Sequence, residues 1–207
     1  MSGDSSQEKT EKPTHKKIAD GSHVYLLHSR LAILDLDPRS NQPMKLGDSI
    51  LSFNGEIYNH LQLRIELEKS GYLPNWHGHS DTETLLAGFE AWGIQKTVQK
   101  SIGMFAFAVW DKLTQTLTLG RDRLDEKPLY YGWQGKGNEA VFLFGSELKA
   151  LKAHPVFEAE ICPNALASFL QNMVVAGTRS IYQGIHKVAP GTLLTLSRQA
   201  PEPVVTR

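Results

Sequence analysis

The chain has 207 residues, of which 41% are hydrophobic, enough to build the core of one sizeable globular domain. Lys+Arg and Asp+Glu both number 22 and no apolar stretch could span a bilayer, so we expect a cytoplasmic protein without a nucleic-acid or membrane partner. The single cysteine, Cys162, excludes an internal disulfide and a cysteine-based metal cage.

The first residues of the chain differ in composition from the rest. Residues 1–22 are charged, rich in Ser and Lys and without apolar periodicity, so we expect a disordered lead. Apolar positions between residues 24 and 36 predict one or two strands. A polar turn follows, and the apolar run Ile50–Phe53 then predicts a buried strand.

The predicted strand Ile50–Phe53 ends at an Asn-Gly pair that has two interpretations. Asn54-Gly55 is the strongest short signal for a type I′ hairpin turn. Alternatively, an Asn amide beside a glycine backbone at a strand end supplies the donors of an oxyanion hole for acyl transfer. Residues Tyr58–Ser70 predict a helix with Asn59 at its N-cap, not a returning strand, and this favours the second interpretation.

The remaining predicted elements describe a layered α+β domain. Ser80-Asp81-Thr82-Glu83 matches a capping box, in which Ser80 and Glu83 each bond a free N–H of the first helical turn, and the helix ends at Gly93. Two hairpins (104–110 with 116–119, and 129–133 with 141–144), two short helices (147–154 and 163–173) and a strand (193–196) follow. The tail 198–207 reads as a linker. Several strands beside segregated helices indicate the α+β class.

Two charged residues suit an amino-acid ligand. Arg30 lies among apolar strand residues, where its guanidinium either clamps a ligand carboxylate or faces solvent. Asp81, just inside a helix start, either receives a ligand ammonium or only complements the helix dipole. Together with an oxyanion pocket, they suit an α-amino acid whose side-chain carbonyl is attacked.

Three further groups have a plainer interpretation as well as a functional one. His77-x-His79 near Asp81 suggests a metal site, but a solvated loop is favoured because no further ligand is evident. The run Arg121-Asp122-Arg123 suggests phosphate binding or structural ion pairs, and ion pairs are favoured. Cys162 has no helix N-terminus or cation beside it to lower its pKa, so we expect an inert thiol.

An ordered set of motifs carries a family resemblance. The segments are HSRLAILDL, NQPM, FNGEIYNH, SDTE, GMFAFAVWD, RDRLDEKPLYY and GSELKAL, within His23–Ser197. In this order and spacing they resemble the glutaminase domain of glutamine-hydrolysing asparagine synthetases, which are class II glutamine amidotransferases. The resemblance implies the four-layer αββα sandwich of N-terminal-nucleophile hydrolases. Residues 23–160 would form the amidotransferase domain, and 161–207 a connection towards a synthetase domain absent from the chain.

The resemblance also implies an activity and its residues. L-glutamine would be hydrolysed to glutamate and ammonia, which passes to the synthetase domain for ATP-dependent amidation of aspartate. Arg30 would match the residue that binds the glutamine α-carboxylate, Asn54 and Gly55 the oxyanion hole, and Glu56 and Asp81 the residues around the amino group. This chain itself would need no cofactor or metal, since ATP and Mg²⁺ serve the synthetase domain. A homodimer partner is a further expectation.

The N-terminus departs from the family pattern. The family nucleophile is an N-terminal cysteine whose own α-amine acts as the base, whereas position 2 here is Ser2. The polar residues after it do not match the family's apolar first strand, so we expect that strand to be missing and the chain to be truncated at both ends. Loose positioning makes Ser2 a poor nucleophile. Asp125 also stands where the family has glycine.

Three hypotheses follow. The first is the glutaminase half of an asparagine synthetase-like enzyme, inactive as given because the cysteine is absent. The second is a non-catalytic glutamine-binding or interaction module that kept the pocket. The third is a bare fragment whose central sheet exposes an unpaired edge.

Overall fold

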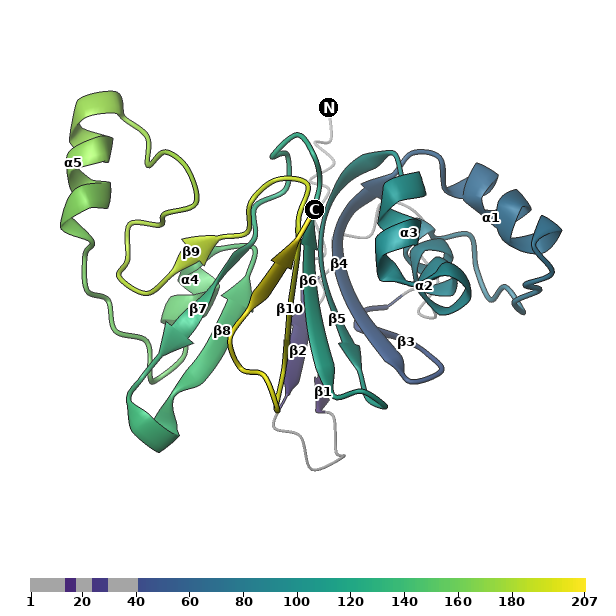
Figure 1. The fold of residues 1–207 in the computed structure, drawn as a ribbon, viewed down its shortest axis with the longest axis horizontal. Helices are drawn as coiled ribbons and strands as arrows, with labels where there is room; N and C mark the ends of the chain where they lie inside the picture. The colour runs from purple at the N-terminus through teal and green to yellow at the C-terminus, as the bar shows by residue number, and fades with distance from the viewer. Residues whose placement is uncertain (1–13, 18–23, 30–40) are drawn as a thin grey trace, which may run out of the picture.

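The computed structural model describes residues 14–17, 24–29 and 41–207, and Figure 1 shows their arrangement. The strands are β1 (Thr14–Lys17), β2 (Tyr25–His28), β3 (Met44–Leu46), β4 (Ser49–Ile57), β5 (Gly103–Asp111), β6 (Thr116–Arg121), β7 (Tyr130–Gln134), β8 (Val141–Gly145), β9 (His186–Lys187), β10 (Leu193–Ser197) and β11 (Val204–Thr206). The helices are α1 (His60–Lys69), α2 (Asp81–Trp92), α3 (Ile94–Lys100), the 3₁₀ turn η2 (Gly137–Glu139), α4 (Leu148–Lys152) and α5 (Pro163–Asn172).

A six-stranded antiparallel sheet forms the centre of the molecule. Its strand order is β11-β10-β6-β5-β4-β3, and β4 and β5 pair in register from Ser49 opposite Asp111 to Ile57 opposite Gly103. A three-stranded sheet, β8-β7-β9, and the β1-β2 pair are separate from it. Helices α1, α2 and α3 gather at one side of the large sheet, whereas β7, β8 and α5 lie towards the opposite end (Figure 1).

Two hydrophobic clusters lie on the two faces of the large sheet. One packs the sheet against the helices and contains Leu51, Phe53, Leu85, Phe89 and Phe107. The other packs it against the remaining strands and contains Leu26, Ala108, Leu119, Leu129 and Leu194, with Tyr131, Phe142 and Phe144 at its margin. Both faces of the central strands are therefore covered, which explains why the run 104–110 is apolar without alternation. The expected α+β sandwich with two β layers is confirmed.

Strand β4 corrects the interpretation of the Asn-Gly pair. It runs from Ser49 to Ile57, straight through Asn54 and Gly55, so the pair is neither a hairpin turn nor the end of the strand. The helix after it is confirmed as α1. Asn59 occupies the N-cap of α1 without capping it. Its side chain instead donates to Lys100 O (3.0 Å) and accepts from Ile102 N (2.9 Å).

The ends of the chain contain more regular structure than expected. Val204–Thr206, within the expected linker, form β11, which pairs with β10. Thr14–Lys17, within the expected disordered lead, form β1, which pairs with β2. Residues 1–13 and 18–23 lie outside the described residues, so a missing first strand stays a prediction, as do the domain boundaries. Within the described ranges, no helix has both the length and the apolar character needed to cross a membrane.

Candidate functional site

The C-terminal part of β4 carries three of the predicted site residues side by side. Asn54 is exposed and lies on the same face of the strand as Ile50, the face that packs against the second β layer. Its side-chain amide donates to Ser146 Oγ at 3.4 Å, just after β8. Gly55 and Glu56 are half-buried. The amide donor therefore lies at the rim between the two β layers, accessible to a ligand.

Gly55 is a glycine because β5 leaves no room for a side chain. A Cβ there would lie 2.1 Å from Met104 O and 2.6 Å from Phe105 Cα. Gly103, near the end of the same ladder, has the matching constraint, since its Cβ would lie 2.0 Å from Glu56 O. The glycines allow β4 and β5 to approach closely where the site residues are placed.

Asp81 joins this group from helix α2. Its side chain is buried, with the residue 6% exposed, and Oδ2 accepts a hydrogen bond from the backbone N–H of Ile57 at 2.9 Å. Oδ1 accepts from Thr82 N at 2.8 Å in the first turn of the helix. The structure thus brings Asp81 beside Glu56, although 24 residues separate Asp81 from Ile57 along the chain. Asp81 can therefore complement the dipole of α2 from its first turn and also lie beside Glu56 at the candidate site.

Arg30 and Ser2 lie outside the described residues, but the strand that leads to Arg30 reaches the site. His28, the last residue of β2, has its Nε2 3.0 Å from Phe53 O, so this nitrogen donates to the carbonyl. Gln42 Oε1 accepts from Phe53 N at 2.6 Å. His28 and Gln42 therefore bond the backbone C=O and N–H of Phe53, which lie on the edge of β4 beyond its pairing with β3 and next to Asn54. Their roles were missed in the sequence, although both lie in the quoted HSR and NQPM motifs.

His60, in the first turn of α1, was also missed. Its Nδ1 is buried and has no hydrogen-bond partner in the described part of the chain. Burial lowers the pKa of His60 and the Arg64 charge adds to this, against the opposing influence of Asp81 and Glu56. His60 is therefore a neutral imidazole near both carboxylates at neutral pH. The sequence could have pointed to His60 through its position at the end of the FNGEIYNH motif.

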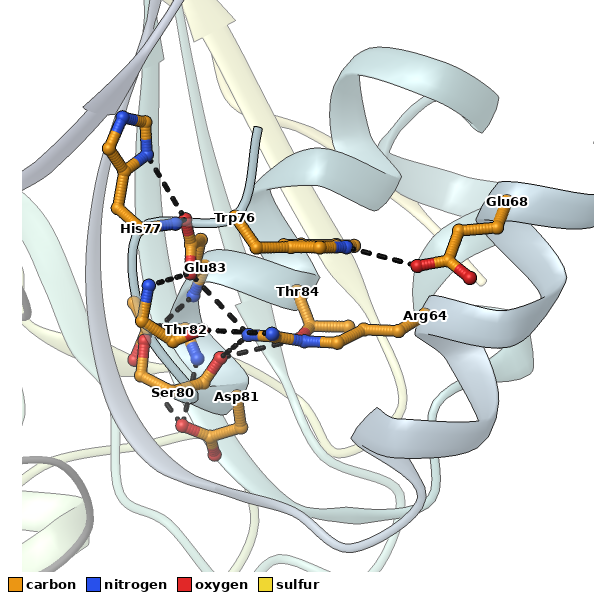
Figure 2. A network of polar contacts seen from close by, with 10 residues as sticks. Arg64, Glu68, Trp76, His77, Ser80, Asp81, Thr82, Glu83 and Thr84 are labelled. Atoms are coloured by element: carbon orange, nitrogen blue, oxygen red, sulfur yellow. Dashed lines mark hydrogen bonds and ion pairs between the residues drawn. The ribbon is translucent and has the colours of Figure 1, made fainter. Parts of the chain in front are cut away.

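The N-terminus of α2 is fixed by a polar network (Figure 2). Ser80 caps the helix by accepting from Glu83 N at 3.2 Å, as expected. The other half of the capping box is wrong, because the Glu83 carboxylate accepts from the backbone N–H groups of His77 (2.7 Å) and Gly78 (3.1 Å). This carboxylate therefore orders the preceding loop. His77 Nδ1 lies 3.4 Å from Glu83 Oε1. In residues 14–17, 24–29 and 41–207, no three His, Cys, Asp or Glu side chains are grouped to hold a metal ion.

The two arginines of the Arg-Asp-Arg run donate hydrogen bonds to backbone carbonyls of the surrounding segments. Arg121 forms an ion pair with Asp125 and donates to the carbonyls of Lys127 and Val188. The ion-pair interpretation is therefore confirmed for Arg121. Asp125 has a φ of 65°, in the left-handed region that glycine adopts readily and aspartate tolerates. Arg123 donates to carbonyls at the end of α3 and just after it, at Val98, Gln99 and Ser101.

Cys162 lies at the N-cap of α5, which corrects the expectation that no helix begins beside it. Helix α5 stands at the opposite end of the molecule from α1 and α2 (Figure 1). The Cys162 thiol is thus attached to a different part of the fold from the residues gathered at β4.

Comparisons with solved structures define the class of fold. Glutamine phosphoribosylpyrophosphate amidotransferase from Bacillus subtilis matches 87% of this chain and 34% of its own, with a TM-score of 0.58 and 19% identity. A structure described as the allosteric regulatory enzyme of purine biosynthesis matches 77% of this chain and 28% of its own, with a TM-score of 0.53 and 20% identity. The fold is accordingly that of the N-terminal-nucleophile hydrolases.

Sequence comparison gives the family. The model of the glutamine amidotransferase domain matches residues 10–204. Asparagine synthetase [glutamine-hydrolyzing] 3 of Bacillus subtilis is 37% identical over 192 residues, which are 90% of this chain and 30% of that protein. A putative asparagine synthetase [glutamine-hydrolyzing] of Mycobacterium bovis is 34% identical over 190 residues, 86% of this chain and 28% of that protein. The chain belongs to the glutamine amidotransferase domain family and spans less than a third of the length of these relatives.

Proposed function

We propose that this domain binds L-glutamine at the end of β4 and serves as the glutaminase part of an asparagine synthetase-like amidotransferase. The observation that carries the proposal is the gathering of Asn54, Gly55 and Glu56 with Asp81, in a chain of the amidotransferase family. A carboxylate pair recognises the glutamine ammonium, and Arg30 binds its α-carboxylate in a two-point fork.

The proposed chemistry places the glutamine side-chain amide against Asn54. The Asn54 Nδ2–H and a backbone N–H at Gly55 stabilise the oxyanion that forms when a nucleophile attacks the amide carbon. Collapse of the tetrahedral intermediate releases ammonia, and hydrolysis of the acyl intermediate releases glutamate. In the family the nucleophile is an N-terminal cysteine, and position 2 of this sequence is Ser2. We expect the 207-residue polypeptide to bind glutamine without enzymatic turnover.

The partners of the domain belong to the same proposal. Ammonia would pass to a synthetase domain of the kind that the longer relatives' names indicate, for ATP-dependent amidation of aspartate. ATP and Mg²⁺ would be bound there, and the glutamine site itself would need no cofactor. We also propose that the protein forms a homodimer and is located in the cytoplasm.

Calorimetric titration of the polypeptide with L-glutamine tests the binding site. We expect saturable binding that weakens at least tenfold in Arg30→Met and in Glu56→Gln, because each loses a charged hydrogen bond of about 1.5–3 kcal/mol. Glu139→Gln, an exposed change in η2, is the matched control and should leave the affinity unchanged. Absence of saturable binding at millimolar glutamine would overturn the proposal.

Glutamate release tests whether this polypeptide turns glutamine over. A second candidate function, a glutamine-binding module without catalysis, is favoured by the position of Cys162 on α5, away from β4. The measurement is glutamate formed by the wild-type chain and by Ser2→Ala. Enzymatic release that disappears in Ser2→Ala would show Ser2 to be the nucleophile and would refute the expected lack of turnover.

A further inference from the structure

We propose that Arg64 is a positioning residue that holds Asp81 in place to receive the ammonium of the ligand. The inference rests on the proposed glutamine site for the identity of the ligand. Its structural part is that Arg64 fixes the Asp81–Ile57 hydrogen bond of 2.9 Å. Figure 2 shows the contacts that Arg64 makes around Asp81.

Arg64 projects from α1 into the loop that precedes α2. The residue is 9% exposed, and its guanidinium donates to Gly78 O at 2.9 Å, Ser80 O at 3.0 Å and Thr84 Oγ1 at 2.7 Å. Ser80 is the N-cap of α2 and directly precedes Asp81. A single planar side chain thus holds the backbone on the N-terminal side of Asp81 and a side chain one turn into the helix.

An aromatic ring covers this guanidinium. The Arg64 Cζ atom lies 4.1 Å from the centroid of the Trp76 ring, and Figure 2 shows the ring parallel to the guanidinium plane. Trp76 Nε1 donates to Glu68 Oε1 at 3.2 Å, one turn after Arg64 on α1. The cation–π contact and the ring's own anchor to α1 limit the movement of the Arg64 head group.

The effect of Arg64 reaches the site through Asp81. Asp81 Oδ2 accepts from Ile57 N, the residue that follows Glu56 on β4. Loss of the guanidinium leaves the buried Ser80 carbonyl without this donor and frees the start of α2 to shift. Displacements near 1 Å at a binding constellation cost up to about a hundredfold in activity. Lysine cannot reach the two carbonyls and the hydroxyl at once, because it lacks the planar fork.

Amide hydrogen exchange tests the structural part without any ligand. In Arg64→Met we expect exchange of the Ile57 N–H to accelerate at least tenfold. The neighbouring Tyr58 N–H, which donates to Ile102 O at 2.8 Å, should keep its rate and serves as the internal control. Lys100→Met is the matched variant, since Lys100 pairs with Glu66 and lies over Trp92, just as Arg64 pairs with Glu83 and lies over Trp76. It should change neither rate, and an unchanged Ile57 rate in Arg64→Met would overturn the proposal.

Ligand discrimination tests the positioning part. We expect Arg64→Met to weaken L-glutamine binding about tenfold and to leave binding of glutaramate, which lacks the α-amino group, unchanged. Equal weakening of both ligands would mean a general structural role and would overturn the proposal. If the wild-type chain binds neither ligand, the proposed function fails, and the exchange experiment still decides the role of Arg64.

A second variant tests the proposal in case Arg64→Met unfolds the whole domain. Trp76→Leu removes only the covering ring, which is half-buried, and leaves Arg64 in place. We expect the same changes as in Arg64→Met at a smaller size, about threefold. Wild-type behaviour of Trp76→Leu in both measurements would refute the role of the ring.

Discussion

Asp122 is the residue whose single carboxylate organises the loop after β6. It is 1% exposed and accepts hydrogen bonds from the backbone N–H groups of Phe105, Leu124, Glu126 and Lys127. Burial alone raises the pKa of Asp122, but the four N–H donors outweigh it and the net shift is downward. The ionised form is therefore required by the fold of this loop.

The pKa of Asp122 gives a pH-dependent prediction. Its folded-state pKa lies below the usual 3.8, so its contribution to stability is present above about pH 4 and is lost as the pH falls through the folded value. We expect Asp122→Asn to reduce the free energy of unfolding by about 2–3 kcal/mol at pH 7, and by progressively less as the pH falls below 3.8. Urea unfolding over this pH range measures this, with the exposed Asp48→Asn as control. Equal midpoints for the two variants at pH 7 would contradict the prediction.

At the scale of elements, the close approach of β4 and β5 places the site. Gly55 and Gly103 lie near the same end of the ladder, and a Cβ at either would meet backbone atoms of the opposite strand within 2.1 Å. Backbone atoms cannot give way as a flexible side chain can. The strands must therefore separate, or the ladder must shift, when either glycine is replaced.

Gly103→Ala tests this constraint without changing a site residue. We expect a loss of about 3 kcal/mol or more in the free energy of unfolding, because the added Cβ would lie 2.0 Å from Glu56 O. The control is Gly71→Ala, at a φ of 85° with nothing within 4 Å, which should cost only about 1 kcal/mol of backbone strain. Thermal or urea unfolding compares the two, and similar losses would disprove the close approach.

At the scale of the whole molecule, the last strands complete a core that begins near residue 26. Leu194 on β10 is 1% exposed and belongs to the same cluster as Leu26 on β2 and Leu119 on β6. β10 pairs with β6 along Leu193–Ser197 and extends the large sheet. Residues on both sides of position 160 therefore share one core, and we expect them to unfold together.

Leu194→Ala measures the cooperation between these parts. We expect it to lower the free energy of unfolding by about 2–5 kcal/mol within a single transition, as does Leu119→Ala. Leu170→Ala on α5, where the leucine is 71% exposed, is the control and should change stability by less than about 0.5 kcal/mol. A separate, earlier transition in Leu194→Ala alone would mean that β10 is not part of the main cooperative unit.

Local patterns were sufficient for most elements. The apolar run 104–110, the Ser80 cap and the helix after Tyr58 follow from short-range rules, and the structure contains all three. The family motifs predicted Asn54, Gly55, Glu56 and Asp81 as site residues, and the structure brings Asp81 to the strand that carries the other three. Their roles in binding stay predictions, as do those of Arg30 and Ser2, which lie outside the described residues.

Tertiary structure decided the features that depend on contacts between distant residues. Asn54-Gly55 reads as a turn or a strand end by its own preferences, but pairing with β5 keeps it extended. The side chains of Asn59 and Glu83 bond the backbone of other segments, since several acceptors or donors compete and only the assembled fold selects one. Arg64 reads as an ordinary residue of a helix face. Its function as an anchor of Asp81 exists only because α1 and α2 pack with the loop between them, and spacing along the chain does not encode that packing.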